Sequence, residues 1–254
     1  MKISAKHNLP ILLYHRVVKN KKEVGRHKIY VYEKQIKAQF EYLKQNNFEC
    51  LTFEQLSLMP PGTDFHKKVI LTFDDGYEDN YTLLFPLLKQ YGFKAVIYLV
   101  TQLKRNEWGI NAGEPPCNLL TIEQIKEMQA YGVEFGGHTQ HHLALNEIDL
   151  PTAKNEIELC KADVETIIGK KMLSFCYPFG GINNEVKKLM LQSNIPYVVA
   201  TNTGAINWQD DKLQIRRLEI RPNELLGSYK NKVSGYYFTR RRIYTLFSKH
   251  IIYK

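Results

Sequence analysis

The stretch Val69-Ile-Leu-Thr-Phe-Asp-Asp-Gly-Tyr77 joins an apolar run to two adjacent carboxylates and a glycine. The apolar run has the composition of a buried strand, and Asp74 and Asp75 stand where it ends. Packing alone does not explain this pair, because neighbouring anions repel and each needs a proton or a cation when water is excluded. The stretch therefore predicts a metal site or a catalytic site at the end of a strand.

A histidine cluster follows a second short strand pattern further along the chain, in Val133-Glu-Phe-Gly-Gly-His-Thr-Gln-His-His142. Imidazoles four residues apart reach the same side of one helical turn, so we expect His138 and His142 to bind one cation together with a carboxylate from a neighbouring strand. His141 is the alternative ligand if the turn is not helical. Two histidines and one aspartate leave positions open for water and substrate, which is typical of a hydrolytic site. Alone, such histidines could equally be surface or core residues; the Asp-Asp-Gly strand end favours the ligand role.

Strand-like runs recur along the chain and alternate with helical patterns. They cover residues 9–14, 48–51, 69–73, 95–100, 133–136, 173–177, 197–200 and 214–220. Between them, Thr121-Ile-Glu-Gln124 reads as a capping box that starts a helix, and Gly169 is expected to end a long helix. Alternating helices and buried strands predict an α/β fold with a parallel sheet, closed into a distorted (β/α) barrel of about seven strands. An open, doubly wound sheet is the alternative.

Residues 102–118 interrupt this alternation. The stretch contains Trp108, two glycines and a pair of prolines, and it directly follows the strand pattern that ends at Val100. It predicts an inserted loop on the side of the barrel that carries the site, where it would shape the substrate groove. A plain surface loop is the other interpretation.

Length and composition fit one barrel-sized domain or two small ones, since 254 residues with 44% hydrophobic content can fill a large core. The four cysteines are scattered without a Cys-x-x-Cys pair, which predicts reduced thiols rather than disulfides or a zinc knuckle. The first ten residues lack the apolar stretch of a signal peptide, and no run approaches the ~18 apolar residues of a spanning helix. We therefore expect a cytoplasmic protein.

The positive charge is concentrated at the C-terminal end. Residues 225–254 hold seven Lys and Arg and no acidic residue, so residues 1–224 carry only +2 of the net +9. We expect a catalytic domain over 1–224 and a basic, aromatic tail over 225–254. Apolar residues of the tail recur at helical spacing after Arg240–Arg242, which predicts either contact with an anionic membrane surface or a helix packed on the domain. No nucleic-acid-binding module accompanies the charge, so we do not expect nucleic acid as a partner.

Three motifs together resemble those of the polysaccharide deacetylases with a NodB-like homology domain. They are Thr72-Phe-Asp-Asp-Gly76, His138-Thr-Gln-His-His142 and Tyr177-Pro-Phe-Gly180, in the order and approximate spacing of that family. The resemblance implies a barrel with its site at the carboxyl ends of the strands. It also implies a hydrolase that uses one divalent metal to remove the N-acetyl group from an N-acetylhexosamine unit of a glycan or a lipid-linked saccharide. Zinc is the expected metal, with cobalt, nickel or iron as alternatives.

The same resemblance assigns roles to individual residues. It implies that Asp75, His138 and His142 hold the metal, that Asp74 is the catalytic base, and that the backbone amide of Phe179 binds the oxyanion. It further suggests four substrate-binding residues: Tyr177, Pro178, Trp208 and Leu218. For Trp208 a packing role is the alternative, and for the Tyr-Pro-Phe-Gly motif the alternative is a simple turn between strand and helix.

Two departures from the common family pattern concern the proton donor and an arginine. No histidine occurs between His142 and His250, where many relatives have the acid, so we expect His15 to protonate the leaving amine. An N-terminal acid resembles the circularly permuted branch of poly-N-acetylglucosamine deacetylases. Cys176 stands where many relatives have the arginine that tunes the base, and Arg16 or Arg217 could replace that arginine.

Other histidines and other functions complete the expectations. Four histidines lack a partner motif and are expected at the surface: His7, His27, His66 and His250. Two alternative functions are an O-acetyl esterase and a non-catalytic glycan-binding protein of deacetylase-like sequence.

Overall fold

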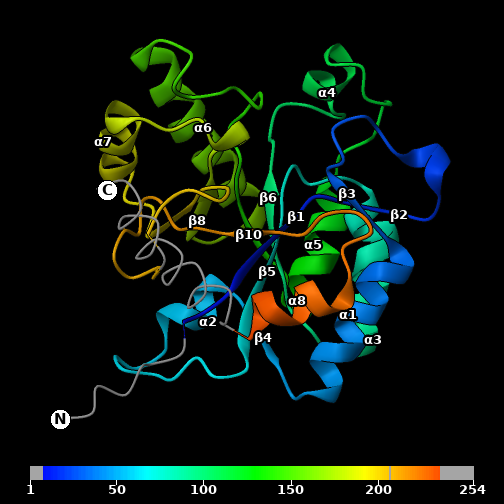
Figure 1. Ribbon diagram of the computed structural model, residues 1–254. Helices are drawn as coiled ribbons and strands as arrows, with labels where there is room; N and C mark the ends of the chain where they lie inside the picture. Colours follow the sequence, from blue (N-terminus) through cyan, green and yellow to red (C-terminus); the bar gives the residue numbers. More distant parts are fainter. Residues whose placement is uncertain (1–7, 206, 235–254) are drawn as a thin grey trace, which may run out of the picture.

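Parallel strands that alternate with helices form the body of the protein, as the computed structural model shows for residues 8–205 and 207–234 (Figure 1). The strands are β1 (Ile11–Tyr14), β2 (Arg16–Val18), β3 (Tyr30–Tyr32), β4 (Glu49–Leu51), β5 (Lys68–Phe73), β6 (Val96–Leu99), β7 (Glu134–Gly137), β8 (Ser174–Cys176), β9 (Tyr197–Val199) and β10 (Leu218–Glu219). The α-helices are α1 (Glu33–Gln45), α2 (Phe53–Ser57), α3 (Phe85–Tyr91), α4 (Glu107–Asn111), α5 (Ile122–Tyr131), α6 (Leu150–Ile168), α7 (Asn184–Gln192) and α8 (Leu226–Val233). Three short turns of helix, η1 (Lys21–Glu23), η2 (Asn80–Leu84) and η3 (Pro178–Gly180), complete the list.

The main sheet runs in the order β10-β1-β5-β6-β7-β8-β9, with β4 also paired to β5, and all its pairs are parallel. Its two ends approach each other. Ala200 N–H donates to the Ile215 carbonyl and Arg217 N–H donates to the Thr201 carbonyl, which brings the segment before β10 beside β9. The seven strands of this path therefore curl into the predicted distorted barrel rather than an open, doubly wound sheet.

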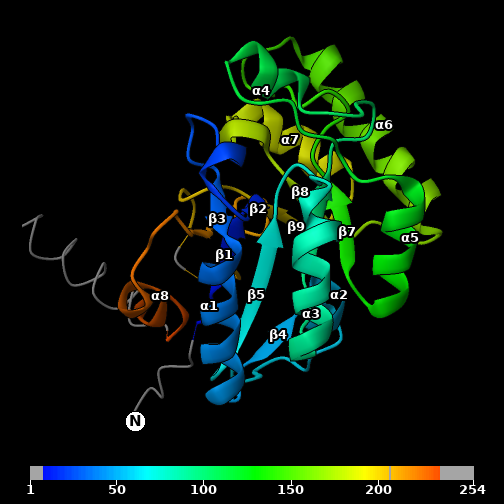
Figure 2. The ribbon, with the colours of Figure 1, turned by 90° about the vertical axis from the view of Figure 1, so that its right-hand side faces the viewer.

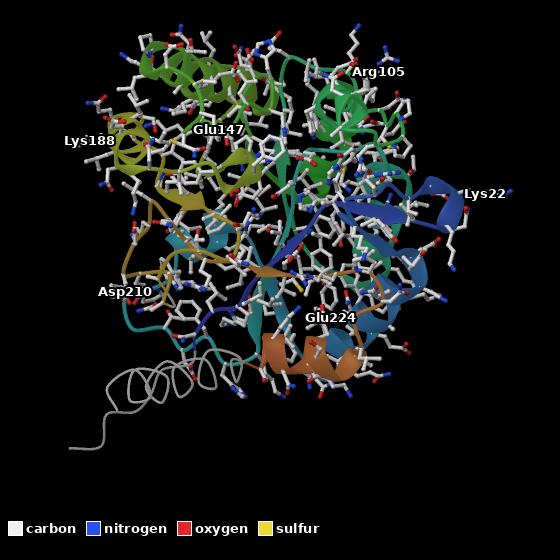
Figure 3. All side chains as sticks on the ribbon, turned by 45° about the horizontal axis from the view of Figure 1, so that its top comes forward. Lys22, Arg105, Glu147, Lys188, Asp210 and Glu224 are labelled. Carbon is white, nitrogen blue, oxygen red and sulfur yellow. The ribbon has the colours of Figure 1, made fainter. Side chains whose placement is uncertain are left out.

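Two apolar clusters lie on the two faces of this curled sheet. One includes Ile11, Ile70 and Val96 and fills the barrel interior. The other includes Leu12, Leu71 and residues of the surrounding helices, and Figure 2 shows α1 and α3 along the outer face of β5. Because successive strand residues point to opposite faces, each strand divides its side chains between the two clusters. Charged residues such as Lys22, Arg105 and Lys188 lie on the outside (Figure 3).

Local signals at the helix ends explain where several of these helices begin and end. Thr121 and Gln124 form the predicted capping box of α5. Gly169 ends α6 in the left-handed conformation, as expected, and Asp149 caps the start of that helix by accepting from the Thr152 amide.

The segment from residue 225 onward begins inside the folded unit. Tyr229 of α8 is fully buried and packs edge-on against Tyr42 of α1. The first part of the predicted tail thus belongs to the same packed body as the barrel. The predicted membrane-contacting part, with Arg240–Arg242, lies outside the described residues. Within the ranges that the structure describes, every helix is too short or too polar to span a bilayer.

Candidate active site

Strand alternation brings side chains from five separate segments to one end of the barrel interior. Ile70 and Thr72 of β5 alternate with outward residues, and Asp74 is the next inward position. The same period of two places His15 after Leu13, and His138 after Gly136. Cys176 belongs to the interior cluster, and Arg217 makes its bonds there. His15, Asp74, His138 and Cys176 lie at the carboxyl ends of their strands, where the fold predicts a site, whereas Arg217 directly precedes β10.

Asp75 joins Asp74 in the site because the backbone changes direction at Asp75. This residue has a left-handed conformation, with φ of 74°, and Gly76 follows with φ of 69°. A non-glycine residue pays roughly 1–2 kcal/mol for this conformation, and such strain concentrates at functional sites. The turn therefore begins at Asp75, one residue before Gly76, and it directs two consecutive carboxylates inward.

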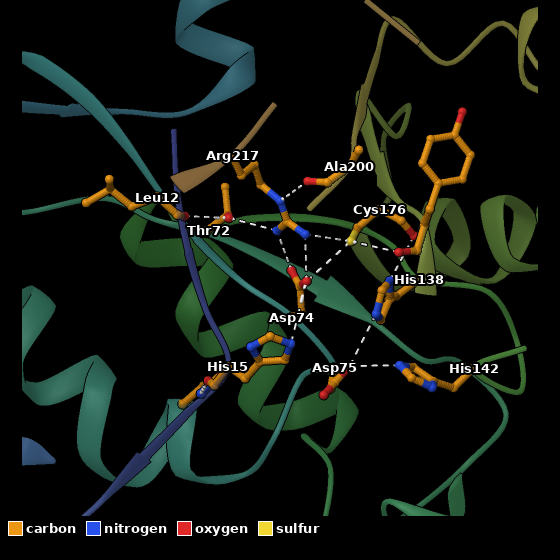
Figure 4. Close-up of polar contacts among 12 residues, drawn as sticks. Leu12, His15, Thr72, Asp74, Asp75, His138, His142, Cys176, Ala200 and Arg217 are labelled. Atoms are coloured by element: carbon orange, nitrogen blue, oxygen red, sulfur yellow. Dashed lines mark hydrogen bonds and ion pairs between the residues drawn. The ribbon is translucent and has the colours of Figure 1, made fainter. Parts of the chain in front are cut away.

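Asp75 lies between two imidazoles. Its Oδ1 atom is 3.2 Å from Nε2 of His138 and 3.1 Å from Nε2 of His142 (Figure 4). Ligand atoms of these three buried residues all lie within 4.8 Å of one another. Although burial by itself would raise the pKa of Asp75, the neighbouring imidazoles hold that pKa well below its ordinary value. Burial lowers the pKa of His142, which favours the neutral ring that binds metals.

The hydrogen bonds of His138 show that this cluster fits a cation. Its Nδ1 atom is 2.8 Å from the Cys176 carbonyl oxygen. Because a carbonyl only accepts, Nδ1 carries the hydrogen, and in the neutral ring the lone pair of Nε2 faces the Asp75 carboxylate. Two electron-rich atoms in a buried site need a positive charge between them, and the contacts with Cys176 and Asp75 accordingly outweigh burial and raise the pKa of His138, so a proton holds this place when no metal cation does. One aspartate and two histidines are a common ligand set for zinc and related divalent metals.

A second group of ligand atoms, on Asp74, His138 and Cys176, is equally close together. Here both oxygens of Asp74 already accept hydrogen bonds from Arg217. The group is therefore satisfied by protein contacts, and the cluster around Asp75 is the better metal site.

The segment from His138 to His142 is not a helical turn, so the geometric reason for the predicted histidine pair was wrong. Thr139 and His142 both have left-handed backbone conformations, and the segment is an irregular loop. His142 is held instead by rings: Trp108 stacks on it at 4.1 Å between centroids, and Phe179 packs edge-on at 4.5 Å. The two imidazoles converge through loop geometry that residue spacing does not encode.

His141, the alternative ligand, points elsewhere. Its Nδ1 atom is 2.6 Å from Oε1 of Glu156, and the ring is half exposed. Glu156 also accepts from the backbone amides of Gln140 and His141. His141 thus helps to fix the loop on α6 and does not reach the cluster of Asp75.

Asp74 is fixed by Arg217. Nη1 and Nη2 of Arg217 donate to the two carboxylate oxygens of Asp74 at 2.6 and 2.7 Å, a bidentate pair. Burial alone would raise the pKa of Asp74, but Arg217 outweighs it and holds that pKa below its ordinary value. Arg217 is itself completely buried and also donates to Ala200, Thr72 and Cys176. Asp74 is therefore ionised and held in one orientation.

The arginine contact that the sequence left open is thus made by Arg217. Its Nη2 atom lies 3.0 Å from Sγ of Cys176. The small cysteine side chain at position 176 therefore leaves space for the guanidinium group of Arg217. Arg16, the other candidate, pairs with Asp79 through Nε at 3.0 Å.

His15 stands beside Asp74 in the same pocket. Its Nε2 atom is 3.9 Å from Oδ2 of Asp74, which is too long for a direct hydrogen bond, so both atoms can contact one reacting group placed beside them. Asn80 donates to the His15 carbonyl and so fixes the backbone at this residue. The position agrees with the predicted role of proton donor, which itself stays a prediction.

A pocket of about 440 Å³ gathers these groups. Asp74, Asp75 and His15 line it together with Tyr177 and Phe179 of the Tyr-Pro-Phe-Gly turn. Phe179 has a left-handed backbone and its ring is largely exposed at the rim. The amides of Gly180 and Gly181 bond within the turn, so neither serves as the oxyanion donor that we assign to the Phe179 amide. Pro178 is buried and shapes the turn.

Three predicted substrate-binding residues do not line this pocket: Pro178 is buried in the turn that carries Phe179, and Trp208 and Leu218 lie elsewhere. Trp208 packs against Phe65 and Tyr197 in the interior cluster and lines a different, smaller pocket. Leu218 pairs with Leu12 in register and faces the outer cluster, because the inward position of β10 is Glu219. Both assignments are corrected: the indole beside the cluster is Trp108, and Leu13 is the apolar residue of β1 that lines the pocket.

Residues 102–118 lie on the site side of the barrel, as predicted, and contribute Trp108, Gly109, Ala112 and Glu114 to the pocket. His27 is exposed, as predicted, and it also lines the pocket. Its backbone amide donates to Oε1 of Glu114 at 2.8 Å. No local motif marks His27, because its place depends on a loop that is distant in sequence.

The curled sheet of parallel strands, with Asp75, His138 and His142 at the carboxyl ends of its strands, defines a (β/α)-barrel protein with a metal-type cluster. A family model described as polysaccharide deacetylase matches residues 62–198, more than half of the chain. The chain belongs to this family, and the resemblance drawn from the three motifs is confirmed.

Individual relatives extend the match beyond the family model. A candidate polysaccharide deacetylase of Bacillus subtilis, YxkH, is 30% identical over 84% of this chain and 72% of that protein. The poly-beta-1,6-N-acetyl-D-glucosamine N-deacetylase of Staphylococcus epidermidis is 26% identical over 75% of this chain and 68% of that protein. Among solved structures, the deacetylase PplD of Streptococcus pyogenes, in complex with acetate, is similar with a TM-score of 0.76 and 25% identity, covering 90% of this chain and 99% of that one. The predicted barrel type is confirmed by this structural match.

Proposed function

We propose that this protein is a metal-dependent deacetylase that hydrolyses the N-acetyl group of an N-acetylhexosamine unit in a glycan or a lipid-linked saccharide. The observation that carries the proposal is the convergence of His138 and His142 on Asp75, directly beside the Asp74–Arg217 pair. The names of relatives that act on poly-N-acetylglucosamine support an N-acetylated amino sugar as the substrate.

The site would hold one divalent cation through Asp75, His138 and His142, and zinc suits this ligand set, with cobalt, nickel and iron as alternatives. When bound, the cation would supply Lewis-acid polarisation of the acetyl carbonyl. Asp74 is ionised by its bond to Arg217, so it accepts the proton of the attacking water. The Phe179 amide donates a hydrogen bond to the oxygen on which negative charge develops.

The leaving nitrogen needs a proton, because an amide anion is a poor leaving group. His15 supplies it from Nε2, which lies in the pocket on the side of Asp74. Asp74 would thus accept a proton and His15 would release one at neighbouring atoms. The end of β5 positions Asp74, and the end of β1 positions His15.

The proposal is tested by measuring metal content and acetate release together. Wild-type protein is expected to carry about one zinc per chain by elemental analysis and to release acetate from N-acetylglucosamine oligomers. In Asp75→Asn, which removes the charge but keeps the shape, both should be lost. Asp210→Asn, at an exposed loop position, is the matched control and should retain both. Full metal affinity in Asp75→Asn would contradict the assignment of the metal site.

A matched pair of substrates separates the alternatives. N-acetyl and O-acetyl derivatives of the same sugar are offered to the metal-loaded protein, and we expect faster acetate release from the N-acetyl sugar. Faster release from the O-acetyl sugar would indicate an esterase. Saccharide binding without any acetate release would indicate a glycan-binding protein.

A further inference from the structure

Two loops that are distant in sequence meet at the mouth of the pocket. One is the loop of residues 19–29 between β2 and β3, and the other is the insertion of residues 102–118, which carries α4. Figures 1 and 2 both show the loop before β3 beside α4 at the end of the barrel that carries the site. Both loops line the pocket, through His27 and Ile29 on one side and Trp108 to Glu114 on the other.

The Glu114 carboxylate fastens the two loops together. Its Oε1 atom accepts from the backbone amide of His27 at 2.8 Å and lies 3.8 Å from Nε2 of the same residue. Its Oε2 atom fills the space beside Gly25, where a Cβ atom would lie only 1.3 Å away. The Glu114 side chain is 5% exposed although it belongs to a surface loop. The buried Glu114 carboxylate accepts a backbone hydrogen bond from the other loop. Because a buried charged acceptor needs such a donor, this contact fixes the two loops relative to each other.

The fastened loops form a continuous wall on one side of the site. The wall runs from Ile29 and His27 through Ala112 and Gly109 to Trp108, whose ring stacks on His142. One loop follows β2, and the other follows β6, which pairs with β5, the strand that leads into Asp74 and Asp75. The remaining rim consists of residues after β8 and β9, including Phe179 and Asn202, and of Glu219 in β10.

A polymer bound through an internal unit needs an exit for the chain on both sides of the reacting sugar. The wall removes one of these exits, and the pocket volume lies near the lower end of the ~300–1,000 Å³ that ligand pockets span. We propose that the protein deacetylates the unit at the end of a saccharide chain, or a short saccharide, rather than internal units of a polymer. This inference rests on the proposed deacetylase function and adds which unit of the substrate enters the site.

The experiment maps where acetate is removed. Metal-loaded protein is incubated with β-1,6-linked and β-1,4-linked N-acetylglucosamine pentamers that carry an isotope label at one end, and the positions of the free amines are read by tandem mass spectrometry. We expect the wild-type protein to deacetylate one terminal unit. Glu114→Ala should raise the ratio of internal to terminal deacetylation by about tenfold, the ratio that corresponds to one hydrogen bond to a charged acceptor. Glu107→Gln, a more exposed carboxylate of the same insertion that pairs with Arg105, is the matched control and should keep the wild-type pattern.

The outcomes are distinct. Equal deacetylation of internal and terminal units by the wild-type protein would overturn the inference and leave the proposed function standing. No acetate release from any saccharide would overturn the proposed function and the inference with it. The position map of the wild-type protein is decisive by itself, so the test stands even if Glu114→Ala fails to fold.

Discussion

The two carboxylates at the end of β5 have different properties because their neighbours differ. Asp74 is bound on both oxygens by Arg217, whereas Asp75 faces two imidazoles. A buried anion is stable only with such partners, and removing one partner from a buried pair typically costs about 3–5 kcal/mol. The adjacent positions therefore suit a fixed base and a metal ligand, respectively.

Among single residues, His15 has a proposed role as proton donor that depends on the leaving group. His15→Gln is expected to slow acetate release from an N-acetyl sugar by about 10²–10⁴-fold, the usual contribution of general acid catalysis. Hydrolysis of para-nitrophenyl acetate should fall far less, because its leaving group departs without a proton. Both rates are measured on metal-loaded protein.

The control for this prediction is His66→Gln, which alters an exposed histidine outside the pocket and should change neither rate. Equal losses on the two substrates in His15→Gln would show that His15 acts on binding or on the base and not on the leaving group.

At the scale of elements, α6 organises two loops of the site through two carboxylates. Glu156 holds the loop of His138 to His142 by its amides, and Asp163 accepts from side chains of Thr101, Gln102 and Gln140. Glu156 and Asp163 are seven residues apart and so lie on the same face of the helix. The ligand loop and the start of the insertion are thus fixed on one rigid element.

Glu156→Ala is accordingly expected to weaken zinc binding by about 10–100-fold, the effect typical of groups that orient metal ligands. Its three contacts to the loop, with the amides of Gln140 and His141 and the ring of His141, would be lost, so His142 would no longer be held toward Asp75. The measurement is a zinc titration against a competing chelator. Glu158→Ala, at a half-exposed position of the same helix, provides the comparison. Unchanged affinity in Glu156→Ala would mean that the rings of Trp108 and Phe179 alone hold His142.

At the scale of the whole molecule, the end of the barrel opposite the site contains a buried acid. Glu134, the first residue of β7, accepts from the Glu54 amide and the Ser174 hydroxyl. Burial raises the pKa of Glu134 from 4.5 to about 7. The ionised form is therefore less favourable in the folded protein than in the unfolded chain, and the barrel is most stable when this group is protonated.

The sign of the pH dependence follows from this shift. The contribution of Glu134 to the free energy of unfolding is complete below about pH 4.5 and falls as the pH rises to about 7. Between about pH 5 and about pH 8, wild-type protein should lose roughly 2–4 kcal/mol relative to Glu134→Gln, measured by urea unfolding at each pH. Glu185→Gln, an exposed change, should track the wild-type protein. A constant difference between wild-type protein and Glu134→Gln would show that Glu134 does not titrate in this range.

Residue patterns along the chain were enough to predict the alternation of strands and helices, the helix caps at Thr121 and Gly169, and the strand end that leads into Asp74 and Asp75. These features depend on side-chain periodicity and on contacts within a few residues, so they can be predicted from the sequence without knowledge of the fold. They were sufficient for the barrel and for the family.

The distant residues that complete the site could be identified only from the folded protein. Arg217 reaches Asp74 across 143 positions, and Trp108 rather than Trp208 stands beside His142. The irregular loop at His142 and the joining of Glu114 to His27 were also beyond sequence patterns. Each of these contacts depends on strand order, on the closure of the barrel and on loop conformation, which place residues together without any fixed spacing along the chain.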